Sequence, residues 1–137
     1  MKIFHKSNDG GPESNVTGYW LIEWKPVFSI VLLRFDKGSR EAYHNHAFNA
    51  ISWILKGRLR EHTLISTSGK CITVSEVDWL RPSVLPVYTS RSRMHKVYGE
   101  AEVTWALSFR GPWKDVWKEY FPKLNKFVSL THGRKEL

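Results

Sequence analysis

Short runs of aromatic and β-branched residues recur along the chain from Tyr19 onward, and Gly, Pro, Ser or Asp residues separate them. Such runs are typical of β-strands, and their short, regular spacing is typical of β-sandwiches and barrels. No long segment before Gly111 repeats its apolar residues at the helical period. The pattern therefore predicts an all-β fold with at least seven strands. The expected strands cover residues 18–24, 26–35, 50–57, 59–66, 70–80, 85–90, 93–99 and 103–109.

The two ends of the chain depart from this pattern. Residues 1–18 include a polar stretch rich in Gly, Asn and Ser, so we expect them to form a loop or flexible arm. Near the other end, Pro112 suits the first turn of a helix and Pro122 ends one. A short C-terminal helix followed by a tail is therefore expected within residues 112–137. The apolar residues at helical spacing in this segment are Trp113, Val116, Trp117 and Tyr120.

The composition is that of one globular domain, residues 1–137, with 42% hydrophobic and 14% aromatic residues. The longest apolar run, 27–33, falls far short of the roughly 18 residues of a membrane helix, and the N-terminus lacks the apolar segment of a signal peptide. One cysteine, Cys71, excludes an internal disulfide framework, which favours a cytoplasmic location. The net charge of +8 comes from 21 basic residues spread along the whole chain, so nucleic acid is not the expected partner.

The most specific local feature is a pair of histidines, His44 and His46. Residues two positions apart on a strand point to the same face, so these imidazoles are expected side by side. Imidazole is a common ligand of Zn, Fe, Cu and Ni, and His95 is the best candidate for a third ligand. Three protein ligands leave positions open, as catalytic metal sites do. A pair of histidines that only caps a sheet remains the alternative at this point.

The spacing around this pair resembles the first sequence motif of the cupin superfamily. Gly38 is followed after five residues by the two histidines, then by position 50 and, six residues later, by Gly57. The motif normally carries Glu where this chain has Ala50. The second cupin motif is looser, with Arg81-Pro82 in place of its proline-containing turn and His95 in place of its single histidine. The resemblance covers roughly residues 25 to 113 and is closest to small, single-domain bacterial and phage cupins.

This resemblance implies a double-stranded β-helix, or jelly-roll barrel, with a divalent transition metal (Fe, Zn, Ni or Mn) held by His44, His46 and His95. Ala50 cannot be a ligand, which leaves a three-histidine site like that of the thiol dioxygenases of the superfamily. Asn49, one residue away, offers only a weakly binding amide oxygen, and His62 is another candidate substitute.

Arginine spacing suggests where an anionic ligand would bind. If residues 91–95 form a strand, Arg91, Arg93 and His95 share one face, so both arginines would lie near the metal. The planar guanidinium suits carboxylate and phosphate groups. A bulge before Met94 would instead turn both arginines to solvent. The remaining candidate ligand-binding residues are Asn49, Trp53, Arg58, Arg60 and His62.

Two functional classes follow. The first is a metal-dependent enzyme of dioxygenase type, an oxidoreductase acting on a small, anionic cytosolic molecule; the complete set of three histidines favours it. The second is a cupin that binds a small anionic or nucleotide-like ligand without chemistry; Ala50 favours it. The apolar strand 18–24 is a candidate for edge pairing, so a homodimer is also expected.

Overall fold

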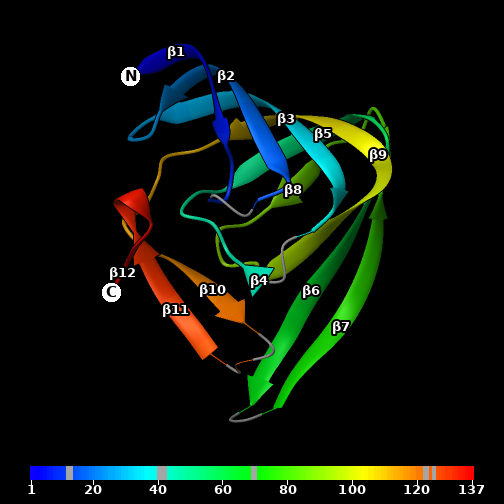
Figure 1. Ribbon diagram of the computed structural model, residues 1–137, viewed down its shortest axis with the longest axis vertical. Coiled ribbons are helices and arrows are strands. Elements are labelled where there is room, and N and C mark those ends of the chain that lie inside the picture. Colours follow the sequence, from blue (N-terminus) through cyan, green and yellow to red (C-terminus); the bar gives the residue numbers. More distant parts are fainter. Residues whose placement is uncertain (12–13, 40–42, 69–70, 122–123, 125) are drawn as a thin grey trace.

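The computed structural model describes residues 1–11, 14–39, 43–68, 71–121, 124 and 126–137. Over these residues the strands join through antiparallel pairs into one curled sheet that forms a barrel, as predicted (Figure 1). A single turn of 3₁₀ helix, His132–Arg134, lies near the C-terminus. No helix in this part of the chain has the length and apolar character needed to cross a membrane. The strands are β1 Lys2–Asn8, β2 Val16–Trp24, β3 Phe28–Gly38, β4 Tyr43–His44, β5 Ala50–Lys56, β6 Leu59–Ser68, β7 Cys71–Leu80, β8 Val87–Thr89, β9 His95–Arg110, β10 Trp117–Phe121, β11 Lys126–Thr131 and β12 Lys135–Glu136.

The long strand β9 organises the barrel. Its first residues pair with β6, and its later residues pair with β3 on one edge and β5 on the other. Side chains alternate between the two faces of a strand, and along β9 the buried residues are His95, Gly99, Thr104, Ala106, Ser108 and Arg110, the last four at alternating positions. Ala106 packs in the apolar core with Trp20, Val31, Leu33, Ile54 and Leu59. Ser108 and Arg110 also line the cavity inside the barrel, so β9 contributes polar groups to it.

The N-terminal residues were predicted to be a loop or arm, and for most of them this is wrong. Residues 2–8 form β1, which pairs with β2 over its whole length, and only the segment between Asn8 and Val16 connects the two. Polar residues fit here because β1 is an edge strand whose side chains are mostly exposed. The same pairing places β2 between β1 and β3, so the strand 18–24 has no free edge for a dimer.

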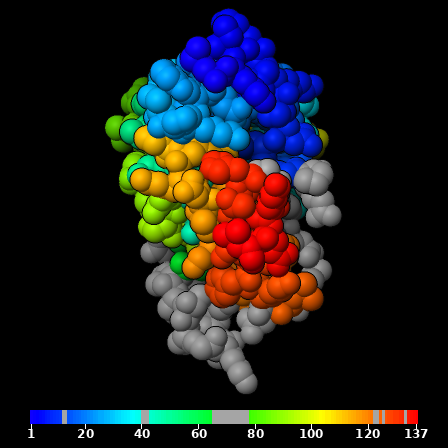
Figure 2. Space-filling view, turned by 90° about the vertical axis from the view of Figure 1, so that its left-hand side faces the viewer, coloured from blue at the N-terminus to red at the C-terminus, as the bar shows by residue number. Residues whose placement is uncertain are grey.

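The predicted C-terminal helix is also absent, because Trp117–Phe121 is strand β10. This strand pairs with β11 on one side and with β4 on the other. The helical spacing of Trp113 and Trp117 has another cause, since both pack against the buried cluster of Ala47, Phe48 and Ala50. Cross-strand pairing thus outweighs the local periodicity. On the face shown in Figure 2, the blue N-terminal strands lie at one end and the orange and red C-terminal segment lies next to them.

Gly57, in the turn between β5 and β6, is expected to tolerate no side chain. Its φ is +92°, and an added Cβ would lie 2.4 Å from Thr104 Oγ1 and 2.8 Å from the Val103 carbonyl oxygen. Gly57→Ala should therefore lower the free energy of unfolding by about 1–3 kcal/mol, measured by denaturant titration. Gly38→Ala is the matched control, because Gly38 has a φ of +104° but nothing within 4 Å of the added Cβ. Equal losses in the two variants would contradict the role of close packing at Gly57.

Candidate metal centre

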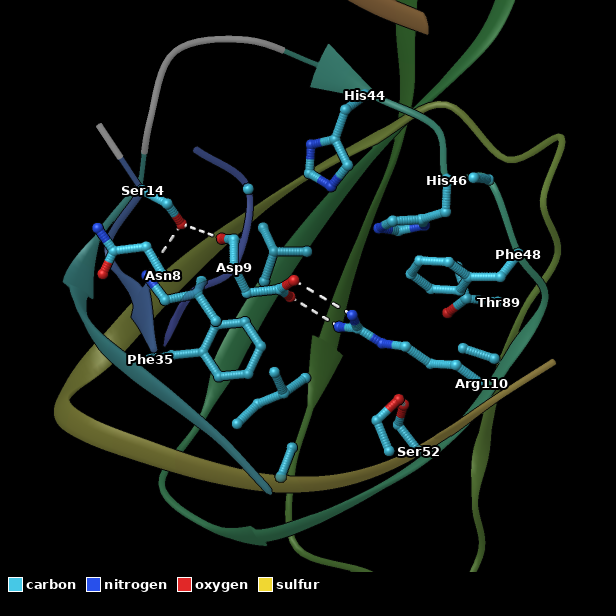
Figure 3. A pocket seen from close by; sticks show the side chains of 18 of the residues that line it. Asn8, Asp9, Ser14, Phe35, His44, His46, Phe48, Ser52, Thr89 and Arg110 are labelled. Atoms are coloured by element: carbon cyan, nitrogen blue, oxygen red, sulfur yellow. Dashed lines mark hydrogen bonds and ion pairs between the residues drawn. The ribbon is translucent and has the colours of Figure 1, made fainter. Parts of the chain in front are cut away.

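Three histidines meet in a cavity of about 600 Å³ inside the barrel. His44 ends β4 and pairs across the strands with His95, the first residue of β9. His46 lies two residues beyond His44, just outside the strand. The ring centroids are 4.8 Å apart for His44 and His46, 4.9 Å for His44 and His95, and 5.0 Å for His46 and His95. The three histidines predicted from the sequence are therefore brought together (Figure 3 shows His44 and His46).

The donor atoms of this trio fit a divalent transition metal. One ring nitrogen from each histidine lies within 4.8 Å of the other two. His95 Nδ1 lies 2.7 Å from the Glu61 carboxylate, while His95 Nε2 is buried and has no hydrogen-bond partner. A carboxylate accepts a hydrogen bond from Nδ1–H, which leaves the lone pair on Nε2. A buried lone pair beside two other imidazoles is the arrangement that a metal ion satisfies.

Glu61, which the sequence analysis missed, holds His95 in this orientation. Its side chain is 2% exposed, accepts a hydrogen bond from His95 and forms an ion pair with Arg93 Nη2 at 2.9 Å. Burial raises the pKa of the Glu61 carboxyl, but the hydrogen bond from His95 and the charges of His95 and Arg93 lower the pKa more, so its net value is below the usual one. Leu59 and Glu61 are both buried, and this alternation along β6 was the available signal for an inward carboxylate.

Ala50, where the cupin motif carries Glu, lines the cavity with a methyl group. Across the part of the chain that the structure describes, the only group of His, Cys, Asp and Glu with metal-ligand spacing is the trio itself. The site thus offers three nitrogen ligands, and Glu61 orients one of them through its hydrogen bond to His95 Nδ1.

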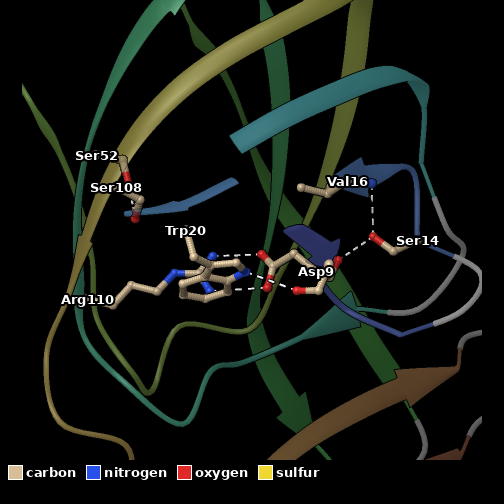
Figure 4. Close-up of polar contacts among 8 residues, drawn as sticks. Asp9, Ser14, Val16, Trp20, Ser52, Ser108 and Arg110 are labelled. Carbon is tan, nitrogen blue, oxygen red and sulfur yellow. Dashed lines mark hydrogen bonds and ion pairs between the residues drawn. The ribbon is translucent and has the colours of Figure 1, made fainter. Parts of the chain in front are cut away.

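A buried cation lies deeper in the same cavity. Arg110 is 5% exposed, and its Nη1 and Nη2 lie 3.1 and 2.7 Å from the two carboxylate oxygens of Asp9 (Figures 3 and 4). Its guanidinium carbon is 5.2 Å from the ring centroid of Trp20 and 4.5 Å from that of Phe48. Neither Arg110 nor Asp9 was predicted from the sequence, although Arg110 continues the inward alternation of β9.

The arginines chosen from the sequence lie elsewhere. Residues 91–94 form a turn and β9 begins only at His95, so the predicted strand through Arg91 and Arg93 is wrong. Arg91 is exposed, and its backbone N–H donates to Asn49 Oδ1 at 2.7 Å. Arg93 forms an ion pair with Glu61 and donates a hydrogen bond to Thr63. Arg93 itself does not line the cavity.

The other candidates also point away from the cavity. Arg58 lies over the Trp79 ring, Arg60 pairs with Glu100, and Trp53 donates to the Val84 carbonyl oxygen. His62 packs on Tyr98, where burial lowers its pKa and the charges of Arg60 and Lys96 lower it further. His62 is thus on the outer face and cannot replace the missing carboxylate. None of these residues or Asn49 lines the cavity as the structure describes it.

No family model matches the chain, and no curated protein matches it. Several solved structures do. A sugar phosphate isomerase of the cupin superfamily from Silicibacter pomeroyi aligns with a TM-score of 0.60 at 10% identity, over 98% of this chain and 89% of that one.

Two further structures support the same architecture. A cupin superfamily protein from Desulfitobacterium hafniense aligns with a TM-score of 0.54 at 15% identity, over 76% of this chain and 84% of that one. The iron(II) form of HppE in complex with substrate aligns with a TM-score of 0.57 at 10% identity, over 77% of this chain and 55% of that one. The barrel, its paired strands and these likenesses show that the chain has the cupin fold.

Proposed function

We propose that this protein is a metal-dependent enzyme of dioxygenase type that acts on a small organic anion inside the barrel. His44, His46 and His95 would hold one Fe, Zn, Ni or Mn ion. The observation that carries the proposal is the buried His95 Nε2, which faces two further imidazoles and has no hydrogen-bond partner. A cavity of about 600 Å³ is also of the size that small molecules occupy.

The residues around the trio have separate tasks in this proposal. With three protein ligands, the metal would keep open positions and act as a Lewis acid or redox centre. Glu61 accepts a hydrogen bond from His95 Nδ1 and so keeps the proton on that nitrogen, which leaves the Nε2 lone pair available to a metal ion. Phe48 stacks on His46 at 5.0 Å between ring centroids and keeps water from that side of the site. Arg110 supplies a buried positive charge to the cavity.

Some proteins with the same fold have functions that fit this proposal. They include an iron(II) enzyme in complex with substrate, an oxalate oxidase and a sugar phosphate isomerase. All are under 25% identical to this chain, so they support a small-molecule site in this barrel without indicating the substrate.

One observation favours a second candidate, a cupin that binds its ligand without chemistry. Each described carboxylate that lines the cavity is engaged by a basic group: Asp9 by Arg110, Glu61 by His95 and Arg93, and Glu23 by His5. A carboxylate can act as a general acid or base only if it can exchange its proton with the substrate. A binding protein has no such need.

Cobalt(II) substitution tests whether the metal site has the open position that the enzyme requires. Cobalt in the metal-free protein should give a visible spectrum that changes on addition of azide, because an enzyme site with three protein ligands keeps an open position. The spectrum of a closed site would not respond to azide. That result would contradict the enzyme and favour the binding protein.

Two earlier expectations remain proposals. We place the protein in the cytoplasm on its single cysteine. We also propose a homodimer, and since 18–24 is an interior strand, the edge strand β1 with its exposed Ile3 and Phe4 would make the contact.

A further inference from the structure

Arg110 occupies an unusual place for a cation. It is the last residue of β9 and faces the interior, where its guanidinium lies between the rings of Trp20 and Phe48. An arginine stays charged even when buried, so this position costs free energy unless an anion neutralises it. The guanidinium carbon lies 5.2 Å from the Trp20 ring centroid and 4.5 Å from the Phe48 ring centroid. The cavity thus contains a fixed, buried positive fork.

The anion that neutralises it comes from the other end of the chain. Asp9 follows β1 directly and meets the two terminal nitrogens of Arg110 with its two carboxylate oxygens (Figure 4). Its backbone N–H donates to the Val16 carbonyl, and its own carbonyl accepts from the Ser14 hydroxyl. The connection between β1 and β2 therefore presents a carboxylate to the guanidinium.

This pairing leaves part of the fork unused. Arg110 Nε is buried and has no hydrogen-bond partner in the described structure, so Asp9 does not satisfy all the donors. The Asp9 side chain is 28% exposed, whereas that of Arg110 is 5% exposed. The carboxylate therefore lies closer to solvent than the cation and is the partner that a ligand can replace.

The fork and the metal centre belong to one cavity. The Phe48 ring lies between them, with its centroid 4.5 Å from the Arg110 guanidinium carbon and 5.0 Å from the His46 ring centroid. In Figure 3, Arg110 extends into the cavity beneath His44 and His46. A small molecule bound to the fork would thus remain in the space that the three histidines line.

We propose that Arg110 is the carboxylate subsite of this cavity and that Asp9 is an internal carboxylate, which occupies the subsite until the carboxylate of a small organic acid displaces it. The inference rests on the proposed function for its location beside a metal centre. The geometry favours carboxylate over phosphate because the group already seated there is planar and binds through two oxygens. Asp9 lowers the apparent affinity for the acid, because only the fraction of molecules in which the fork is free can bind it.

Isothermal titration of the metal-free protein with malonate, acetate and inorganic phosphate tests this inference. Asp9→Asn should bind malonate at least about tenfold more tightly than the wild type, because the internal competitor loses its charge. Asp36→Asn is the matched control, since Asp36 pairs with Arg34 on the exposed surface, and it should leave malonate binding unchanged. Arg110→Lys keeps the charge but loses the planar fork, so it should bind malonate at least about tenfold more weakly than the wild type.

Loss of Arg110 alone leaves Asp9 without its partner, so folding is secured by a second variant. Asp9→Asn/Arg110→Met replaces the pair by neutral side chains, and circular dichroism checks that it keeps the wild-type spectrum. It should bind no malonate. Unchanged malonate binding in this double variant, no gain in Asp9→Asn, or tighter binding of phosphate than of malonate would overturn the inference. Because every titration is done without metal, failure of the three-histidine site leaves these results unaffected, and the two proposals fail separately.

Discussion

Replacing His44 by alanine is expected to leave the protein without metal. Wild-type protein reconstituted with Fe, Zn, Ni or Mn and passed through a desalting column should retain about one ion per chain, whereas His44→Ala should retain close to none. The reason is geometric, because the three rings form a nearly equilateral triangle, with centroids 4.8, 4.9 and 5.0 Å apart, and removal of His44 leaves only two ligands. Two remaining imidazoles should bind at least about a hundredfold more weakly. Elemental analysis by mass spectrometry gives the stoichiometry.

His62→Ala is the control for this experiment. His62 lies on the outer face of β6 against Tyr98, at 4.9 Å between ring centroids, and does not line the cavity. Its removal deletes the same chemical group while the trio stays complete, so the variant should keep its metal. Metal loss in His62→Ala, or full retention in His44→Ala, would remove the three-histidine site from the proposed function.

The histidine trio could be predicted because its signal is local. The spacing of Gly38, His44, His46 and Gly57 lies within one stretch of chain, and the strand-like run at His95 is also local. Even so, the reason given for the pairing was only partly right, since His46 lies beyond the end of β4. The barrel was predictable for the same reason, because short runs of β-branched and aromatic residues mark strands one by one.

The cation of the cavity could not be predicted in this way. Arg110 and Asp9 are 101 positions apart in the sequence. No spacing rule predicts a contact that forms only when the end of β1 and the end of β9 meet in the folded barrel. The arginines selected instead were neighbours of His95 in sequence. That choice assumed a strand through residues 91–95. The chain instead turns there, and Arg93 forms an ion pair with Glu61. Alternation along β9 identifies Arg110 as inward only after the strand's register is known.

Glu61→Gln is expected to weaken metal binding by about 10- to 100-fold while all three ligands remain. The Glu61 carboxylate accepts a hydrogen bond from His95 Nδ1 at 2.7 Å and forms an ion pair with the Arg93 guanidinium at 2.9 Å. Glutamine keeps one oxygen acceptor, but its NH₂ group must then face either His95 or Arg93, both of which donate. A neutral glutamine no longer supplies the negative charge that keeps the His95 proton on Nδ1. Nε2 would then carry a free lone pair for the metal for only part of the time. Competition with a fluorescent zinc chelator measures the affinity.

Glu100→Gln shows how much of that loss is specific to Glu61. Glu100 pairs with Arg60 at 3.0 Å on the outer surface of the barrel, so the same exchange there removes a carboxylate from an arginine without reaching a ligand. Exposed pairs of this kind contribute little, and zinc affinity should stay within about twofold of the wild type. Thermal unfolding of the metal-free variants separates the two effects, because a purely structural role for Glu61 would lower the midpoint and leave zinc affinity unchanged. Equal zinc affinity in Glu61→Gln and Glu100→Gln would show that the carboxylate behind His95 does not orient the ligand.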